Sequence, residues 1–217
     1  MTHTNGQAAP LRVCAAIRRN PYGYMLDDAG LRALLTALGE RQAASIARNH
    51  AAPAGEAPRG PYPRPAMGFV VLDPTAEPGA DPADLVLGAV TVGDDARRFL
   101  PKAAAKAAAH RRLGGSNGTA VHTDPHLLGS DAFRYGHSAE VRGVVVAASS
   151  QSPDQDLYEA SRLAADLVEA IGARHREYER QEGERDWLAA TDEPPARYVE
   201  MTAWFPDDAD EPLGSVG

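Results

Sequence analysis

The feature that most constrains this fold is an apolar run followed at once by a long amphipathic pattern. Residues 140–150, "EVRGVVVAASS", read as a buried strand, because β-branched residues dominate the run. Ser152 then begins a capping box with Gln155 three residues later, and Pro153 occupies the first helical position. The pattern predicts a strand that leads directly into a long helix over residues 152–183. The apolar stripe of that helix comprises Leu157, Ala160, Leu163, Ala164, Leu167, Val168 and Ile171.

Earlier segments indicate further strands and helices. Residues 11–18 have strand composition, and Asp27 or Asp28 can cap a helix that we expect over about residues 29–48. "MGFVVLD" and "DLVLGAVTVG" are β-rich and separated by Pro, Gly and Asp, which predicts two neighbouring strands. After Gly93 the chain becomes Ala-rich and helical, and Pro101 fits only near the first turn.

Between that helix and the buried strand we expect an irregular loop rich in His, Asp and Gly that extends to about Ser138. Near the C-terminus, "RYVEMTAWF" alternates enough to predict one more strand. The short connection between the paired strands favours antiparallel neighbours, because parallel strands need a longer crossover. The predicted fold class is therefore α/β in the α+β sense, with an antiparallel sheet flanked by helices.

The distribution of Pro, Gly and acidic residues suggests the domain limits. Residues 1–25 form an N-terminal extension with a possible strand, and residues 26–175 form the main domain. Within it, residues 50–65 are too rich in Pro and Gly for a regular element and predict an extended loop. Residues 176–217 form a C-terminal extension whose acidic end we expect to be partly disordered.

Charge and hydropathy exclude several classes of function. The 217 residues carry a formal net charge of −8, so the basic surface that nucleic acids require is missing. No apolar run approaches the roughly 20 residues that cross a bilayer, and the N-terminus lacks the apolar core of a signal peptide. We therefore expect a cytoplasmic protein without nucleic-acid or membrane partners. The single cysteine, Cys14, has no internal disulfide partner and is expected to pack as a small hydrophobe.

Several short motifs resemble those of the GlcG/HbpS-like family over about residues 26–171. They are "VVLDP", "VTVGDDA", "KAAAH" and "GVVVAASSQSPDQD", and the last places Gln155 and Asp156 where the family has its Gln-Asp pair. Three family features differ here: the Arg before the turn Asp is absent, the final strand ends in Ala148 and Ser149 instead of glycines, and a "GGxP" loop is replaced. The resemblance implies a profilin- or PAS-like antiparallel sheet flanked by helices. It also implies a homo-oligomer that binds haem or a related tetrapyrrole in some members.

The only two lysines of the chain lie in "LPKAAAKAAAHRR", which makes this segment a candidate ligand site. On one helix, Arg98, Lys102, Lys106 and His110 would share a face, because they are spaced four residues apart. Stacked cations repel each other, so a negative group is expected to face them. That group is either a carboxylate of this chain, from Asp94, Asp95 or the last helix, or the carboxylates of haem or a substrate. Within the resemblance, Lys106 matches the lysine of the family's "KAxTA" helix.

A second candidate site lies in the loop "HTDPHLLGSDAFRYGHSAE". His122, Asp124, His126 and His137 carry imidazole and carboxylate groups, which suit zinc, iron or other first-row metals. A neutral histidine can equally ligate haem iron or act as an acid or base. Histidines in polar loops are otherwise exposed, and no Cys pair or helical His-Glu-x-x-His motif strengthens the pattern. His137 is the best single candidate, because the adjacent strand would fix its position.

These observations leave three hypotheses for function. The first is a homo-oligomeric binding protein for haem or another flat anionic small molecule. The second is an enzyme on the same fold that acts on a small metabolite, with the loop histidines as ligands of a divalent metal such as Zn or Fe, or as acid and base. The third is an accessory protein without a ligand.

Overall fold

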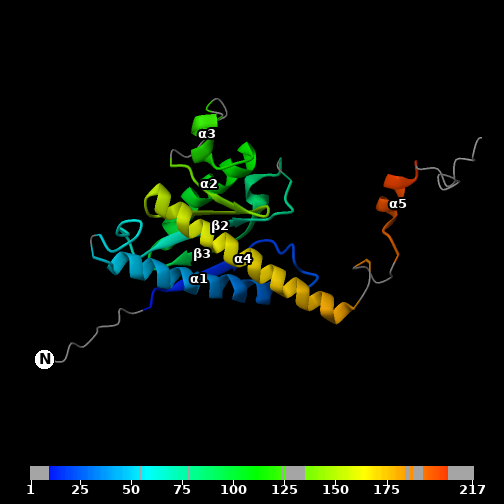
Figure 1. The fold of residues 1–217 in the computed structure, drawn as a ribbon, viewed down its shortest axis with the longest axis horizontal. Helices are drawn as coiled ribbons and strands as arrows, with labels where there is room; N and C mark the ends of the chain where they lie inside the picture. Colours follow the sequence, from blue (N-terminus) through cyan, green and yellow to red (C-terminus); the bar gives the residue numbers. More distant parts are fainter. Residues whose placement is uncertain are drawn as a thin grey trace, which may run out of the picture. The chain divides into compact units, whose positions relative to one another are not determined.

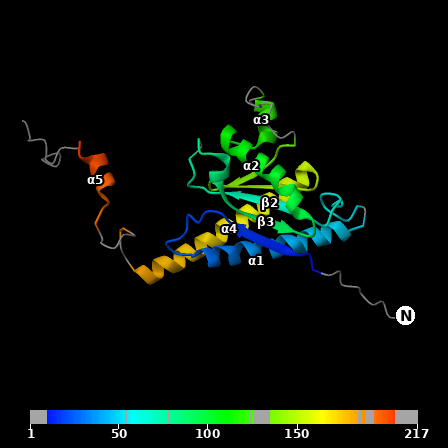
Figure 2. The same ribbon diagram turned by 180° about the vertical axis from the view of Figure 1, so that it is seen from behind.

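The computed structural model divides the chain into two compact units, Met1–His175 and Arg176–Gly217, which we describe separately. Figures 1 and 2 show the chain from opposite sides. The structure describes residues 10–53, 55–77, 79–123, 125, 135–183, 186–187 and 193–204.

The first unit is built on a five-stranded antiparallel sheet. Its strand order is β1-β3-β2-β5-β4, so β1 and β4 form the two edges. The predicted strands "MGFVVLD" and "DLVLGAVTVG" are antiparallel neighbours in this sheet, which confirms the mixed α and β class. The strands are β1 (Val13–Ile17), β2 (Met67–Leu72), β3 (Val86–Val92), β4 (Ala139–Val141) and β5 (Val144–Ser149).

Helices cover both faces of the sheet. Figures 1 and 2 show α1 and α4 along one face and α2, with α3 beyond it, on the other. None of the helices in the described ranges is long and apolar enough to cross a membrane. The α-helices are α1 (Asp28–Ala51), α2 (Leu100–Leu113), α3 (Asn117–Thr123), α4 (Pro153–Glu182) and, in the second unit, α5 (Ala196–Thr202). The 3₁₀-helix η1 (Pro82–Leu85) precedes β3, and the 3₁₀-helix η2 (Ala96–Phe99) precedes α2.

Two apolar cores lie on opposite faces of this sheet. Phe69 and Val146 belong to the larger core, which α1 and α4 cover with residues such as Leu35 and Leu163. The smaller core contains alternate residues of the same strands, among them Val145, packed against the alanines of α2. Because side chains alternate along a strand, β2 and β5 are buried on both faces, which explains their continuous apolar runs.

The predicted starts of α1 and α4 are confirmed. Asp27 caps α1, because its side chain accepts a hydrogen bond from the Gly30 backbone N–H at 2.7 Å. At α4, Gln155 N donates to Ser152 Oγ at 3.4 Å, and Ser152 N donates to Gln155 Oε1 at 3.2 Å. Both halves of the capping box are therefore formed. Pro101 lies in the first turn of α2, where its missing N–H costs nothing.

The strand predicted over residues 140–150 is instead a hairpin of β4 and β5. Arg142 and Gly143 form its two-residue turn, with φ angles of 49° and 82°. Two successive residues with positive φ are typical of the tight turns that reverse an antiparallel pair. The sequence prediction missed this turn because Arg is an unusual residue at its first position.

Two further predictions were wrong at the level of secondary structure. Part of the predicted irregular loop before Ser138 forms the short helix α3, and the predicted strand in "RYVEMTAWF" forms α5. A strand needs a neighbour for its backbone hydrogen bonds, whereas a helix satisfies them internally. The β-rich composition of the α5 segment was therefore insufficient to make a strand there.

Candidate functional site

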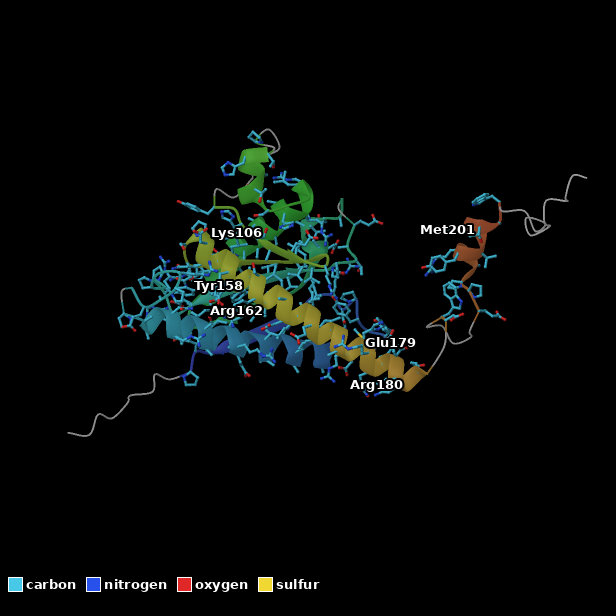
Figure 3. All side chains as sticks on the ribbon, in the orientation of Figure 1. Lys106, Tyr158, Arg162, Glu179, Arg180 and Met201 are labelled. Atoms are coloured by element: carbon cyan, nitrogen blue, oxygen red, sulfur yellow. The ribbon has the colours of Figure 1, made fainter. Side chains whose placement is uncertain are left out.

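The centre of the candidate site is a buried ion pair between α2 and α4. Lys106 Nζ lies 2.7 Å from Asp156 Oδ2 and also donates to the Ala148 carbonyl at 2.9 Å. The side chains of Lys106 and Asp156 are only 1% and 4% exposed. Figure 3 labels Lys106 close to the first turns of α4. The pair joins α2 to the end of β5 and the start of α4.

The surroundings of Asp156 act on its ionisation in opposite directions. Burial raises its pKa above the ordinary value, and Lys106 together with hydrogen bonds from the backbone opposes that shift. One of those bonds runs from Gln151 N to Asp156 Oδ1 at 2.9 Å. The expected negative partner of Lys106 is thus confirmed as an acidic residue of the last predicted helix, and charge balance holds this part of the site together.

The ion pair lies at the wall of a cavity of about 210 Å³, which we call the lysine cavity. Both lysines of the chain line it, so the clustering seen in the sequence corresponds to one place in the fold. Tyr135 contributes an aromatic side chain that is 53% exposed. The lining residues are Arg64, Phe99, Lys102, Lys106, Tyr135, Ser149, Ser150, Gln151, Pro153 and Asp156.

Among the described residues that line the lysine cavity, cations outnumber carboxylates. Arg64, Lys102 and Lys106 contribute three cations, and Asp156 contributes one carboxylate that is already paired with Lys106. Lys102 is exposed. Pro153 begins the 30-residue helix α4, whose N-terminal end adds a partial positive charge. The cavity is therefore suited to an anion.

The turn between β5 and α4 fixes the cavity wall. Ser150 has a φ of 154°, and its Oγ donates to the Ala66 carbonyl at 2.5 Å. The guanidinium of Arg64 donates to the Ser150 carbonyl at 2.8 Å. The side-chain nitrogen of Gln151, Nε2, donates to the backbone carbonyls of Arg64 and Ala66, both at 2.9 Å. These bonds tie the end of the Pro-rich loop to the turn, so Arg64 is positioned by backbone contacts.

The four residues predicted to share one face are distributed over different surroundings. Arg98 belongs to η2, before α2 begins, and its guanidinium lies 4.9 Å from the centre of the Phe99 ring. It lines a neighbouring concavity, whereas Lys102 and Lys106 line the lysine cavity. His110 is buried and bonded elsewhere. The structure therefore brings two of the four together.

His110 links α2 to the β4 edge of the sheet. Its Nδ1 lies 2.7 Å from Ser138 Oγ, and its Nε2 lies 2.9 Å from Glu140 Oε2. A serine, a histidine and a carboxylate in a row resemble a catalytic triad in composition. In a triad the acid is buried and the serine faces the substrate, but here Ser138 is 3% exposed and the side chain of Glu140 is 46% exposed. The arrangement is reversed, so Ser138 is not placed as a nucleophile.

The predicted metal ligands have separate positions where they are described. His122 is exposed on α3, and half-buried His137 precedes β4 with a φ of 78°. A Cβ on Gly118 would lie 2.1 Å from the His137 ring, so this glycine allows the ring its place. Asp124 and His126 lie outside the described residues. Within the described ranges, no three His, Cys, Asp or Glu side chains gather as a metal site would require.

Sequence reasoning missed a second buried acid, Glu159, which lies on α4 and is fully buried. Its Oε1 accepts hydrogen bonds from Ser45 Oγ and from Tyr62 OH, both at 2.8 Å. Burial, followed by the nearby charge of Glu159, raises the pKa of Tyr62. Arg162, labelled in Figure 3, lies 3.4 Å from the other carboxylate oxygen. This network holds the Pro-rich loop against α1 and α4.

One further signal in the sequence pointed to a part of this site. Glu159 lies between Leu157 and Ala160 within the predicted helical stripe, and an acid so close to an apolar face was a sign of a buried polar contact. Nothing comparable singled out Arg64, because arginines are frequent throughout the chain.

Comparisons with known proteins add no relative: no family model, curated protein or solved structure matches this chain. Fold and site together define an α+β protein with an open antiparallel sheet and a positively charged cavity where that sheet meets α2 and α4.

Proposed function

We propose that this protein binds a small anionic molecule, of the carboxylate type, in the lysine cavity. The observation that carries the proposal is that both lysines of a chain with net charge −8 line one cavity, together with Arg64 and the N-terminal turn of α4. Asp156 neutralises Lys106, which leaves Lys102 and Arg64 as the exposed cations for a ligand. Charge-assisted hydrogen bonds from such groups are the usual way to hold a carboxylate.

The size of the cavity favours a compact ligand. A volume of about 210 Å³ is below the roughly 300 Å³ at which sites for drug-sized ligands begin. A mono- or dicarboxylate of a few carbon atoms suits this space better than a whole tetrapyrrole. The half-exposed Tyr135 and the Phe99 ring provide apolar surface for the carbon part of such a molecule.

The GlcG/HbpS-like resemblance and haem binding stay as a second proposal. The antiparallel sheet supports it, and so does the contact between Lys106 and Asp156, which come from two different motifs of that resemblance. Haem iron needs only one imidazole from this chain, and His137 and His122 are the described candidates. The propionates would then occupy the lysine cavity, with the ring outside it.

The first experiment is calorimetric titration of the protein with acetate, pyruvate, malonate, succinate and phosphate. We expect saturable binding of at least one carboxylate. Lys102→Gln and Arg64→Gln should each weaken it by about tenfold, because each removes a charged donor. Arg32→Gln is the matched control, since Arg32 is an exposed cation on α1 outside the cavity.

Two results would contradict the proposal. One is the absence of binding for all five anions at millimolar concentration. The other is unchanged affinity in both cavity variants, which would place the anion elsewhere. Phosphate binding without carboxylate binding would keep the site but change the ligand class.

A separate titration with haem, followed by visible absorption, tests the second proposal. A saturable Soret shift that is lost in His137→Ala or His122→Ala would support it and identify the ligand. A protein that binds small carboxylates but gives no shift at micromolar haem would leave only the first proposal standing.

A further inference from the structure

One half of a sheet face has no α-helix packed on it among the described residues, and only the 3₁₀-helix η2 reaches β3 there. On this side α2 packs against β2 and β5, while β1 presents the exposed Cys14 and Ala16 and β3 the half-buried Thr91 and Ala89, the latter at the margin of the smaller core. Cys14 lies opposite Thr91 and Ala16 opposite Ala89, so the four residues form one patch, which we call the open sheet face. Cys14 and Ala16 are exposed, which corrects the prediction that Cys14 packs as a small hydrophobe.

The open sheet face is the floor of a concavity of about 670 Å³. Its floor consists of small side chains, so another surface can approach the backbone closely. Residues of the loop after β3 and of η2, together with Arg12, form the border of the concavity. The lining residues are Arg12, Cys14, Ala15, Ala16, Ala89, Thr91, Gly93, Asp94, Asp95, Ala96, Arg97 and Leu100.

The border of this concavity carries equal numbers of opposite charges. Arg12 and Arg97 are cationic, Asp94 and Asp95 are anionic, and all four are exposed. None of these side chains makes a hydrogen bond or ion pair with another residue in the described part of the chain. A border with two charges of each sign around an uncharged floor can pair with a second copy of itself about a two-fold axis.

We propose that the open sheet face docks a second copy of this chain in a two-fold symmetric dimer. In such an interface both subunits use the same patch. Each contact between a residue of one copy and a residue of the other therefore occurs twice, related by the two-fold axis. Arginines of one copy then face aspartates of the other, and the small floor residues pack across the axis. A partner that is strongly acidic or strongly basic would instead meet two like charges.

This dimer is independent of the anion site. The concavity above the open sheet face and the lysine cavity share no lining residue. Loss of carboxylate binding therefore leaves the dimer proposal intact, and a monomeric protein leaves the anion proposal intact. The two proposals fail or succeed on different measurements.

The oligomeric state is the first test. Sedimentation velocity from 1 to 200 µM at low salt should show a species of twice the 23.0 kDa chain mass. Ala16→Arg places a bulky cation on the floor and should raise the dissociation constant at least tenfold. Ala44→Arg makes the same change on the exposed side of α1 and should leave the dimer unchanged. Far-UV circular dichroism checks that both variants are folded.

A charge exchange tests the self-complementarity itself. The double variant Arg12→Asp/Arg97→Asp makes the border wholly acidic, and Asp94→Arg/Asp95→Arg makes it wholly basic. Each double variant should be monomeric by itself in sedimentation velocity. An equimolar mixture of the two should again show a species with the mass of a dimer. Alkylation of Cys14 by a maleimide should slow in the mixture relative to either variant, because the interface covers the thiol.

Any of three results would overturn the proposal. They are a wild-type protein that stays monomeric up to 200 µM, an Ala16→Arg variant that dimerises like the wild type, and border variants that dimerise alone as well as in the mixture. The last result would show a dimer formed through another surface.

Discussion

At the scale of single residues, the protein is unusual in how it buries charge. Lys106 and Asp156 form one buried pair, and Glu159 is enclosed with Tyr62 and Ser45 as hydrogen-bond donors. Removing a charge from water is costly, so each of these groups depends on its partners. Removing one member of such a pair should therefore lower the stability of the fold more than removing both members.

The Lys106 pair tests this expectation. Lys106→Met leaves the buried carboxylate of Asp156 without its cation and should lower the free energy of unfolding by about 3–5 kcal/mol. The double variant Lys106→Met/Asp156→Leu removes both charges and should be more stable than the single variant. Urea unfolding of the wild type, of Lys106→Met, of Asp156→Leu and of the double variant gives the comparison. A double variant that is as unstable as the sum of the single variants would show that the two residues act independently.

Tyr62 predicts a dependence of stability on alkaline pH. Its pKa is raised in the folded protein, so above about pH 10 the unfolded chain loses a proton that the folded chain keeps. The contribution of Tyr62 to stability is therefore complete below pH 10 and decreases above it, by up to about 1.4 kcal/mol per pH unit.

The matched variant for that prediction is Tyr62→Phe. At pH 7 this variant should have a free energy of unfolding lower than that of the wild type by about 1.5–3 kcal/mol, because Glu159 loses a hydrogen-bond donor. The difference in free energy of unfolding between the variant and the wild type should decrease between pH 9 and pH 11.5, because only the wild type loses the contribution of Tyr62. The other tyrosines titrate equally in both proteins and cancel. Urea unfolding at several pH values measures it. A constant difference would mean that Tyr62 titrates normally.

At the scale of elements, the start of α4 decides the geometry of the site. The capping box fixes where the helix begins, and the preceding turn fixes Arg64 and Asp156 relative to each other. The same first turn lines the lysine cavity. Local helix chemistry and ligand binding therefore share this segment.

Ser152, which caps α4, and Ser161, which lies inside it, should respond differently to the same substitution. Ser152→Ala removes the cap and should cost about 1 kcal/mol. Ser161 only donates back to the Leu157 carbonyl inside the helix, so Ser161→Ala should be neutral or slightly stabilising. Thermal and urea unfolding provide the measurement. Equal losses in both variants would contradict the assigned role of the cap.

At the scale of the whole molecule, a chain with net charge −8 must attract an anion against its own average field. The local cations around the lysine cavity have to outweigh that repulsion at short range. Anion binding should therefore be sensitive to ionic strength, because salt screens exposed Lys102 and Arg64.

Salt dependence thus gives a prediction for the bound carboxylate. Its dissociation constant should rise several-fold between 0.05 and 0.5 M NaCl, and Lys102→Gln should show a smaller rise than the wild type. Calorimetric titration at three salt concentrations measures both slopes. Equal slopes in the two proteins would show that Lys102 does not contact the anion.

Much of the fold followed from local sequence patterns, because these patterns encode local physics. Apolar periodicity and the caps predicted α1 and α4, and β-rich runs predicted β2 and β3 as antiparallel neighbours. The hairpin of β4 and β5 and the helix α5 were missed, because a turn with Arg at positive φ and a helix of β-rich composition both run against residue preferences.

The candidate site was predictable only in part. The rarity of lysine drew attention to Lys102 and Lys106, and an acidic residue of the last helix was one of several negative partners that the sequence left open. The prediction that Arg98 and His110 share a helix face with these lysines assumed one continuous helix. The structure instead has η2 before α2, and it gives Arg98 and His110 other surroundings. The roles predicted for His122 and His137 stay predictions.

By itself, then, the sequence determined the limits of α1 and α4, the main strands and the presence of a lysine cluster, since spacing and capping act over a few residues. Only the tertiary structure decided that Arg64 reaches the lysines, that Asp156 pairs with Lys106, and that the face around Cys14 stays open. Those contacts join segments from distant parts of the chain. Their geometry depends on how the helices pack on the sheet, which no local pattern specifies.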